Sequence, residues 1–89
     1  MQRNIVVRVT SDFTRAFRCL PKHLQRIAER KDQRFRGSPF HPGLRTHQLK
    51  GELNGLCSYA VNDAYRVLFR FVTDNEVLYY DIGTHEIYR

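Results

Sequence analysis

The first hydrophobic period in the chain is that of a strand. Ile5, Val7 and Val9 alternate with Val6 and Arg8, and most of these residues are β-branched. Alternation with period two is typical of a strand, and β-branched side chains favour it. The chain therefore begins with a short predicted strand.

Two helical periods follow this strand. Residues 10–12 offer N-cap oxygens, and the first helical stripe comprises Phe13, Ala16, Phe17 and Leu20. Pro21 interrupts this helix, and its fixed φ suits the first turn of the next helix. The second stripe comprises Leu24, Ile27, Ala28, Lys31 and Phe35. Gly37 suits its C-cap. The pattern predicts a helical hairpin.

The second half of the chain reads as a loop followed by three strands. Residues 38–48 contain Pro and Gly without a sustained period, which predicts a loop. Strands are predicted over 53–61, 65–72 and 76–82, with turns at 62–64 and 73–75. Asn54-Gly55 also has hairpin chemistry, but too little chain lies between Gln48 and Asn54 for a full partner strand. We therefore expect no hairpin at that position.

These elements predict an α+β fold with an N-terminal strand, a helical hairpin and a three-stranded antiparallel meander. Both apolar stripes are buried most simply if the helices lie on one face of a single sheet. The length of 89 residues fits one domain spanning residues 1–89.

Period two in the middle strand of the meander separates an aromatic side from a basic side. The aromatic side comprises Tyr65, Val67, Phe69 and Phe71. We expect it to face the helices, which leaves Arg66 and Arg70 on the open face of the sheet. The pattern does not decide whether the chain after Ile82 leaves the sheet beside Arg66 or at the opposite end.

Charge is unevenly distributed along the chain. The net charge is +6, and residues 1–50 hold twelve of the fifteen Lys and Arg against three acids. Residues 51–89 hold three arginines against six acids. A basic half of this kind favours a polyanionic partner, either RNA or an acidic protein segment. A solvated helix face explains it equally well.

No segment is long and apolar enough to span a bilayer, and the N-terminus has no signal-peptide core. We expect a cytoplasmic protein without a membrane partner. Cys19 and Cys57 lie on separate predicted elements, which favours two buried, reduced thiols over a disulfide or a zinc site. No motif for a metal or a small-molecule cofactor is present.

Candidate chemistry is confined to a few residues. RNA cleavage by its own 2′-OH needs a base, a cation for the phosphorane and an acid for the leaving 5′-oxygen. Histidine suits the proton transfers and arginine suits the phosphate. The candidates are His47, Lys50, Arg66, His85 and Tyr88.

The remaining histidines and tyrosines are assigned less demanding roles. His23, on the second helix, and His41, in the Pro-rich loop, are interpreted as surface residues. Tyr59 and Tyr80 are most simply interpreted as residues that pack within the sheet. Either would instead stack on a base if it faced the open side.

Four segments together resemble the RelE/ParE superfamily of type II toxins. They are His47-Gln-Leu-Lys-Gly, Leu53-Asn-Gly55, Asp63-Ala-Tyr-Arg-Val-Leu-Phe69 and Ile82-Gly-Thr-His-Glu-Ile-Tyr88. The resemblance implies a β-α-α-β-β-β order. Members known as mRNA interferases cut messenger RNA in the ribosomal A site without a metal, through attack by the 2′-OH.

The resemblance also implies residue roles. Arg66 occupies the phosphate-stabilising arginine position, His85 the general-acid position and Tyr88 that of a substrate-orienting aromatic. His47 stands where some subfamilies place the base, and Lys50 would add a phosphate contact. Further RNA contacts are expected at Arg70, Arg30 and Arg34. The implied partners are the ribosome, messenger RNA and a cognate antitoxin with an acidic segment.

One subfamily relies on lysines in the first meander strand, and residues 56–61 have none. The base must therefore be His47 or a group not identified by sequence. Two alternatives remain: a non-enzymatic ParE-like toxin that inhibits DNA gyrase, and an inactive antitoxin-binding module. The presence of both His47 and His85 favours RNA cleavage.

Overall fold

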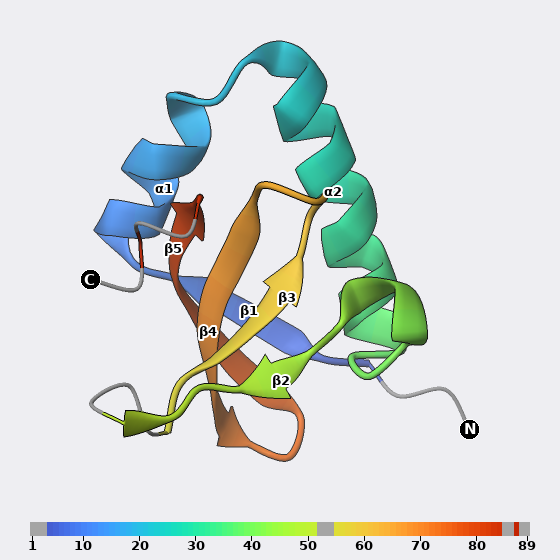
Figure 1. Ribbon diagram of the computed structural model, residues 1–89. Coiled ribbons are helices and arrows are strands. Elements are labelled where there is room, and N and C mark those ends of the chain that lie inside the picture. The colour runs from blue at the N-terminus through green and yellow to red at the C-terminus, as the bar shows by residue number, and fades with distance from the viewer. Residues whose placement is uncertain (1–3, 52–54, 85–86, 88–89) are drawn as a thin grey trace.

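The computed structural model describes residues 4–51, 55–84 and 87, and it has the α+β architecture expected from the sequence. Two helices form a hairpin that arches over one sheet (Figure 1). In chain order the elements are β1 (Val6–Val9), α1 (Ser11–Arg18), α2 (Lys22–Gly37), η1 (a 3₁₀ turn, Pro42–Leu44), β2 (His47–Gln48), β3 (Cys57–Ala60), β4 (Arg66–Thr73) and β5 (Glu76–Gly83).

The sheet has the strand order β1-β5-β4-β3-β2. β1 pairs with β5 in parallel, and the other neighbours are antiparallel. The helical hairpin carries the chain from β1, at one edge of the sheet, to β2 at the other edge, and the antiparallel strands then lead back to β5 beside β1. The β4–β5 register shifts between Leu68 and Phe69, where Leu68 pairs with Asp81 and Phe69 pairs with Tyr79. Tyr80 is therefore the extra residue of a bulge.

An aromatic cluster holds the helices against the sheet. The ring of Phe35, on α2, is fully buried, and its centroid lies 4.8 Å from that of Tyr59 and 4.9 Å from that of Phe69. The ring of Phe13, on α1, lies 5.2 Å from that of Tyr79. Phe69 and Tyr79 are cross-strand partners and share one face. Both helices therefore cover the same face, and the predicted aromatic side of the meander is confirmed.

A chain of polar side chains crosses this helix-covered face. The Tyr59 hydroxyl donates to the Tyr79 hydroxyl at 3.0 Å, and Tyr79 donates to Oδ1 of Asp32 at 2.7 Å. Nε of Arg36 donates to both carboxylate oxygens of Asp32. Burial is the main cause that raises the pKa of both tyrosines above the usual range. Both hydroxyls thus stay neutral and hydrogen-bonded in the core.

The helix ends are capped locally. Oγ1 of Thr10 accepts from the backbone N–H of Phe13 at 3.0 Å, as an N-cap residue does. Nε2 of Gln25, in the first turns of α2, donates to the carbonyls of Phe17 and Leu20 at the end of α1. α2 begins at Lys22 after Pro21 and includes Gly37, so the predicted boundaries are correct within one residue.

The region predicted as a loop contains more structure than expected. η1 and β2 lie within it, and β2 pairs with β3 through His47–Ser58 and Gln48–Cys57. The backbone N–H of Leu49 continues this ladder to the carbonyl of Leu56. A β2–β3 hairpin is therefore present, although we expected none. The expectation failed because it required a full partner strand, whereas β2 has only two paired residues. Gly55 has φ +95°, which suits a glycine in the turn; Asn54 lies outside the described residues.

One further expectation was wrong in part. Cys19 is exposed at the end of α1, although we expected it to be buried; Cys57 is buried as expected, and both are free thiols. Tyr59 is 1% exposed on the helix-covered face, so it packs within the sheet and does not face a bound base. Among the described residues, no helix is long and apolar enough to cross a membrane.

Candidate functional site

The β4–β5 register answers a question that the sequence left open. Arg66 pairs with Gly83, so the chain leaves β5 beside Arg66. A Cβ on Gly83 would lie 2.6 Å from Cγ2 of Ile87, which means that Ile87 packs directly over this glycine. Cross-strand partners direct side chains to the same face. Ile87 therefore lies over the face that carries Arg66, and a side chain at position 83 would displace it.

The guanidinium of Arg66 is positioned by the β3–β4 turn. Its Nη1 donates to the backbone carbonyls of Asn62 and Tyr65. The side-chain oxygen of Asn62 accepts from the N–H groups of Ala64 at 2.9 Å and Tyr65 at 2.8 Å. These two bonds form an Asx turn that fixes the carbonyls. Asn62 therefore orients the guanidinium of Arg66, because its Asx turn fixes the carbonyls that accept from Nη1.

The charge of Arg66 is not balanced by a carboxylate in the described part of the chain. The ion pairs found there join Arg8 to Glu76, Arg15 to Asp12 and Arg36 to Asp32. Backbone carbonyls orient a guanidinium without cancelling its charge, and its remaining N–H groups match phosphate oxygens. Arg66 is half-buried at the start of β4 and can receive an anion.

His47 is exposed at the start of β2, with its ring tautomer set by the backbone. Its Nδ1 lies 2.9 Å from the carbonyl oxygen of Arg45. Because a carbonyl only accepts, Nδ1 must carry the hydrogen. In the neutral ring, Nε2 then keeps its lone pair and can act as a base. Arg45 has φ +52°, in the left-handed region, so the turn that places this carbonyl carries backbone strain.

His47 and Arg66 lie on the same face of the sheet. His47 pairs with Ser58 and Ser58 with Leu68, while Arg66 lies two residues before Leu68 on β4. Two strand spacings and two residue rises separate their Cα atoms by roughly 12 Å. Their long side chains can therefore reach a phosphodiester lying between them, although they do not contact each other.

The centre of this face is less open than the sequence suggested. Leu68 is 7% exposed, Ala60 is 6% exposed and Ser58 is fully buried. Among the described residues, the Ser58 hydroxyl has no hydrogen-bond partner. We define the face that carries His47, Ser58, Arg66, Leu68 and Arg70 as the polar face. It has a small apolar centre with cationic and imidazole groups around it.

Comparison with known protein families identifies the family of this chain. The family model described as the RelE-like toxin of type II toxin–antitoxin system HigB matches residues 8–85, which is most of the chain. The chain belongs to this HigB-like toxin family. The match confirms the expected membership in the RelE/ParE superfamily of toxins.

Solved structures share the fold of this HigB-like chain. The RelBE2 toxin–antitoxin complex of Mycobacterium tuberculosis has a TM-score of 0.75 and 22% identity, covering 92% of this chain and 99% of that one. YafQ from E. coli has a TM-score of 0.72 and 13% identity, with coverages of 96% and 98%. The archaeal RelE–RelB complex of Pyrococcus horikoshii has a TM-score of 0.71 and 18% identity, with coverages of 91% and 94%. A comparison with curated protein sequences gives no match.

The other candidate residues of this HigB-like chain fall into three groups. Arg70 is exposed on β4 and shares the polar face, and Lys50 is exposed just after β2. Arg30 and Arg34 are exposed on α2, which covers the opposite face, so they form a separate basic region. His85 and Tyr88 lie outside the described residues.

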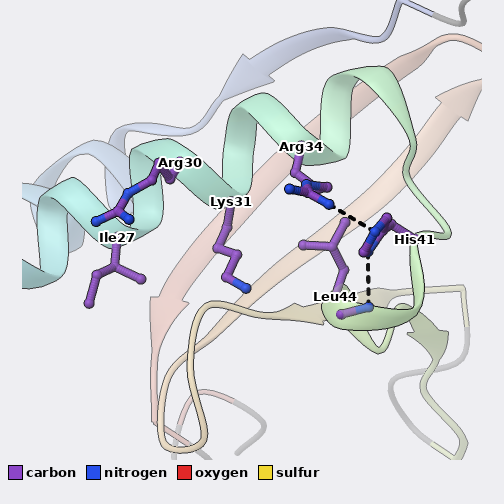
Figure 2. A pocket seen from close by; sticks show the side chains of 7 residues that line it. Ile27, Arg30, Lys31, Arg34, His41 and Leu44 are labelled. Atoms are coloured by element: carbon purple, nitrogen blue, oxygen red, sulfur yellow. Dashed lines mark hydrogen bonds between the residues drawn. The ribbon is translucent and has the colours of Figure 1, made fainter.

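Sequence reasoning missed one group in the separate basic region. His41 is half-buried rather than a free surface residue, and its Nε2 lies 2.8 Å from Nη1 of Arg34 (Figure 2). The two residues line a pocket between α2 and η1. The Pro42-Gly43 turn after His41 was the available signal, because a tight turn can direct the preceding side chain back toward the helix.

Proposed function

We propose that this HigB-like protein is the toxin of a type II toxin–antitoxin system and that it cleaves messenger RNA on the ribosome. One observation carries the proposal. The polar face presents a guanidinium without a carboxylate partner in the described chain and an imidazole with a free Nε2, and the C-terminal segment begins beside that guanidinium.

The proposed reaction is a metal-free transesterification. Nε2 of His47 takes the proton of the 2′-OH, and the 2′-oxygen attacks the adjacent phosphorus. Arg66 binds the non-bridging oxygens as negative charge builds on them. His85, two positions after Gly83 in the sequence, donates a proton to the 5′-oxygen as the P–O5′ bond breaks. The products are a 2′,3′-cyclic phosphate and a 5′-hydroxyl.

Further contacts would hold the substrate. Lys50 and Arg70 contact phosphates next to the scissile one, and Tyr88 orients the nucleotide that is cut. Arg30 and Arg34 contact ribosomal RNA, which gives the affinity a strong salt dependence. The ribosome supplies the geometry of the messenger, so free RNA is a poor substrate.

The proposed silencing partner is an antitoxin with an acidic segment that covers the polar face. Two structural neighbours are toxin–antitoxin complexes, which supports a partner of this class. An acidic segment would neutralise Arg66 and Arg70 and would exclude the messenger from the face. Localisation in the cytoplasm follows from a ribosomal target.

A translation-coupled cleavage assay tests the function with two changes. In the first, the messenger carries a single 2′-deoxy nucleotide at the cleavage site; we expect binding without cleavage, because the nucleophile is missing. In the second, His47→Ala slows cleavage by about 100-fold or more, since a general base contributes at least that much. His23→Ala is the matched control, because His23 is an exposed histidine on α2.

Two results would overturn the proposal. Cleavage of the 2′-deoxy messenger at the normal rate would remove the 2′-OH mechanism. Toxicity without any cleavage, accompanied by DNA damage and co-purification of gyrase, would favour the ParE-like alternative.

A further inference from the structure

A basic pocket lies between α2 and the 3₁₀ turn η1, away from the polar face (Figure 2). Its volume is about 320 Å³. The side chains of Lys31 and Arg34 extend from the side of α2 that faces the loop carrying His41. The lining residues are Ile27, Arg30, Lys31, Arg34, His41, Gly43 and Leu44.

The lining of this pocket is unbalanced in charge. Arg30, Lys31 and Arg34 contribute three cations, and no acidic residue is part of the lining. Ile27 and Leu44 supply an apolar floor. Groups of one sign in a concave site focus the field and attract a counter-ion. The pocket is therefore built for an anion.

The ring of His41 adds an independent observation. The backbone N–H of Gly43 donates to its Nδ1 at 3.0 Å, so Nδ1 is the acceptor of the ring. Nε2 must then carry the hydrogen, because a neutral imidazole has only one acceptor nitrogen. Yet Nε2 lies 2.8 Å from Nη1 of Arg34, which also only donates. Two donors therefore face each other, and an anionic oxygen bound beside them would relieve this repulsion by accepting a hydrogen bond.

The loop that presents His41 is held firmly. Leu44 is fully buried in the core, and the Thr46 hydroxyl donates to the carbonyl of Pro39. The exposed ring of Phe40 stacks on Phe71 with centroids 5.9 Å apart. These contacts fix His41 opposite α2 before any ligand arrives, so the ordering cost of binding is small.

We propose that this pocket binds a phosphate of an RNA backbone and docks the toxin on its target; the inference rests on the proposed function. Donors come from α2 and from the facing loop, so they can reach different oxygens of one phosphate, and the guanidinium fork matches phosphate geometry. η1 ends at Leu44, close in the chain to His47. RNA docked in the pocket therefore lies near the strand that carries the proposed base.

The first experiment tests the pocket without a ribosome. ¹⁵N-labelled protein is titrated with a short single-stranded RNA and, separately, with a polyglutamate peptide of equal charge. We expect the RNA to shift the signals of the Gly43 N–H and the Arg34 side chain in a saturable way, and the peptide to shift them much less. No shift with RNA, or tighter binding of the peptide, overturns the inference.

The second experiment measures binding to purified ribosomes as a function of salt. Arg34→Gln should weaken binding about tenfold and lower the salt slope by about one, since one phosphate contact is lost. Arg26→Gln is the matched control, because Arg26 has the same charge on α2 but does not line the pocket. It should change the affinity by about twofold or less. Both residues are exposed, so neither change should affect folding.

The two failures are distinguishable. Wild-type protein that cuts messenger on the ribosome while Arg34→Gln binds as tightly as Arg26→Gln would retain the proposed cleavage and remove the pocket, together with the contact of Arg34 with ribosomal RNA. Wild-type protein that ignores ribosomes but binds RNA through Gly43 and Arg34 would retain the pocket and remove the proposed function.

Discussion

The two faces of the sheet differ in how their polar groups are satisfied. On the helix-covered face, Tyr59, Tyr79, Asp32 and Arg36 form a continuous chain of hydrogen bonds inside an aromatic cluster. On the polar face, carbonyls orient Arg66 without neutralising it, and the buried hydroxyl of Ser58 has no partner among the described residues. A buried hydrogen-bond network specifies a fold, whereas a guanidinium at the surface whose charge is not balanced is available to an anionic ligand.

Because of this difference, we expect stability to depend on the helix-covered face and cleavage to depend on the polar face. Changes on the helix-covered face should alter the free energy of unfolding, because they remove packing or paired hydrogen bonds. Changes on the polar face should alter cleavage while the fold persists.

The largest effect is expected at Phe35. Phe35→Ala removes the ring that contacts Tyr59 and Phe69, and it should lower the free energy of unfolding by about 3–5 kcal/mol. Phe40→Ala is the control, because Phe40 is 62% exposed. Urea denaturation measures both. A similar loss in the two variants would show that the aromatic cluster does not hold the fold.

The buried tyrosines predict a loss of stability in alkali. Burial raises the pKa of Tyr59 and Tyr79 in the folded state, so their contribution is complete below pH about 10 and is lost as the pH rises above it. Each tyrosine should then cost about 1.4 kcal/mol per pH unit. Tyr59→Phe should be about 1 kcal/mol less stable at pH 7 and should show a shallower alkaline decline. Equal slopes in wild type and variant would contradict the neutral hydroxyl pair.

Asn62 tests whether a turn positions Arg66. Asn62→Ala removes the acceptor of two backbone N–H groups and should cost about 1 kcal/mol of stability. Cleavage should fall about tenfold because the carbonyls that orient Arg66 are released. Asn62→Asp keeps the acceptor and should restore stability, while its carboxylate neutralises Arg66 and keeps cleavage low. Full cleavage by Asn62→Ala would remove the positioning role.

The smallest effect is expected at Arg45, next to the polar face. Arg45→Gly relieves a left-handed conformation, and the gain is partly offset by the entropy of glycine in the unfolded chain. The net change should be a stabilisation of about 0.5 kcal/mol in urea denaturation. The carbonyl that fixes the His47 tautomer remains, so cleavage should persist. A clear loss of stability would show that the arginine side chain contributes more than the backbone strain costs.

Periodic segments were predicted well, because a period repeats its information along the chain. The stripe from Phe13 to Leu20 and the alternation through Phe69 identified the helix and strand faces. The β2–β3 hairpin was missed because only two residues pair in β2. The parallel β1–β5 pair brings together strands from the two ends of the chain, and no local sequence pattern predicts such a pairing.

The site was predicted less completely than the fold. Residue types and the resemblance pointed to His47 and Arg66, but only the register shows that both share a face and that the chain leaves β5 beside Arg66. His41 was missed because its meaning depends on a contact with Arg34 across a loop. Such a contact is a property of tertiary geometry, and sequence spacing does not reveal it.

Single-turnover cleavage of ribosome-bound messenger by Arg66→Ala, with the Tm of the same sample, tests the separation of the two faces most directly. Arg8→Ala is the control, because Arg8 is an exposed arginine on β1. We predict that Arg66→Ala cuts about 100-fold more slowly or worse, with a Tm within about 2 °C of wild type. Cleavage at the wild-type rate, or a loss of activity that is matched by unfolding, would contradict the assignment of the polar face to catalysis.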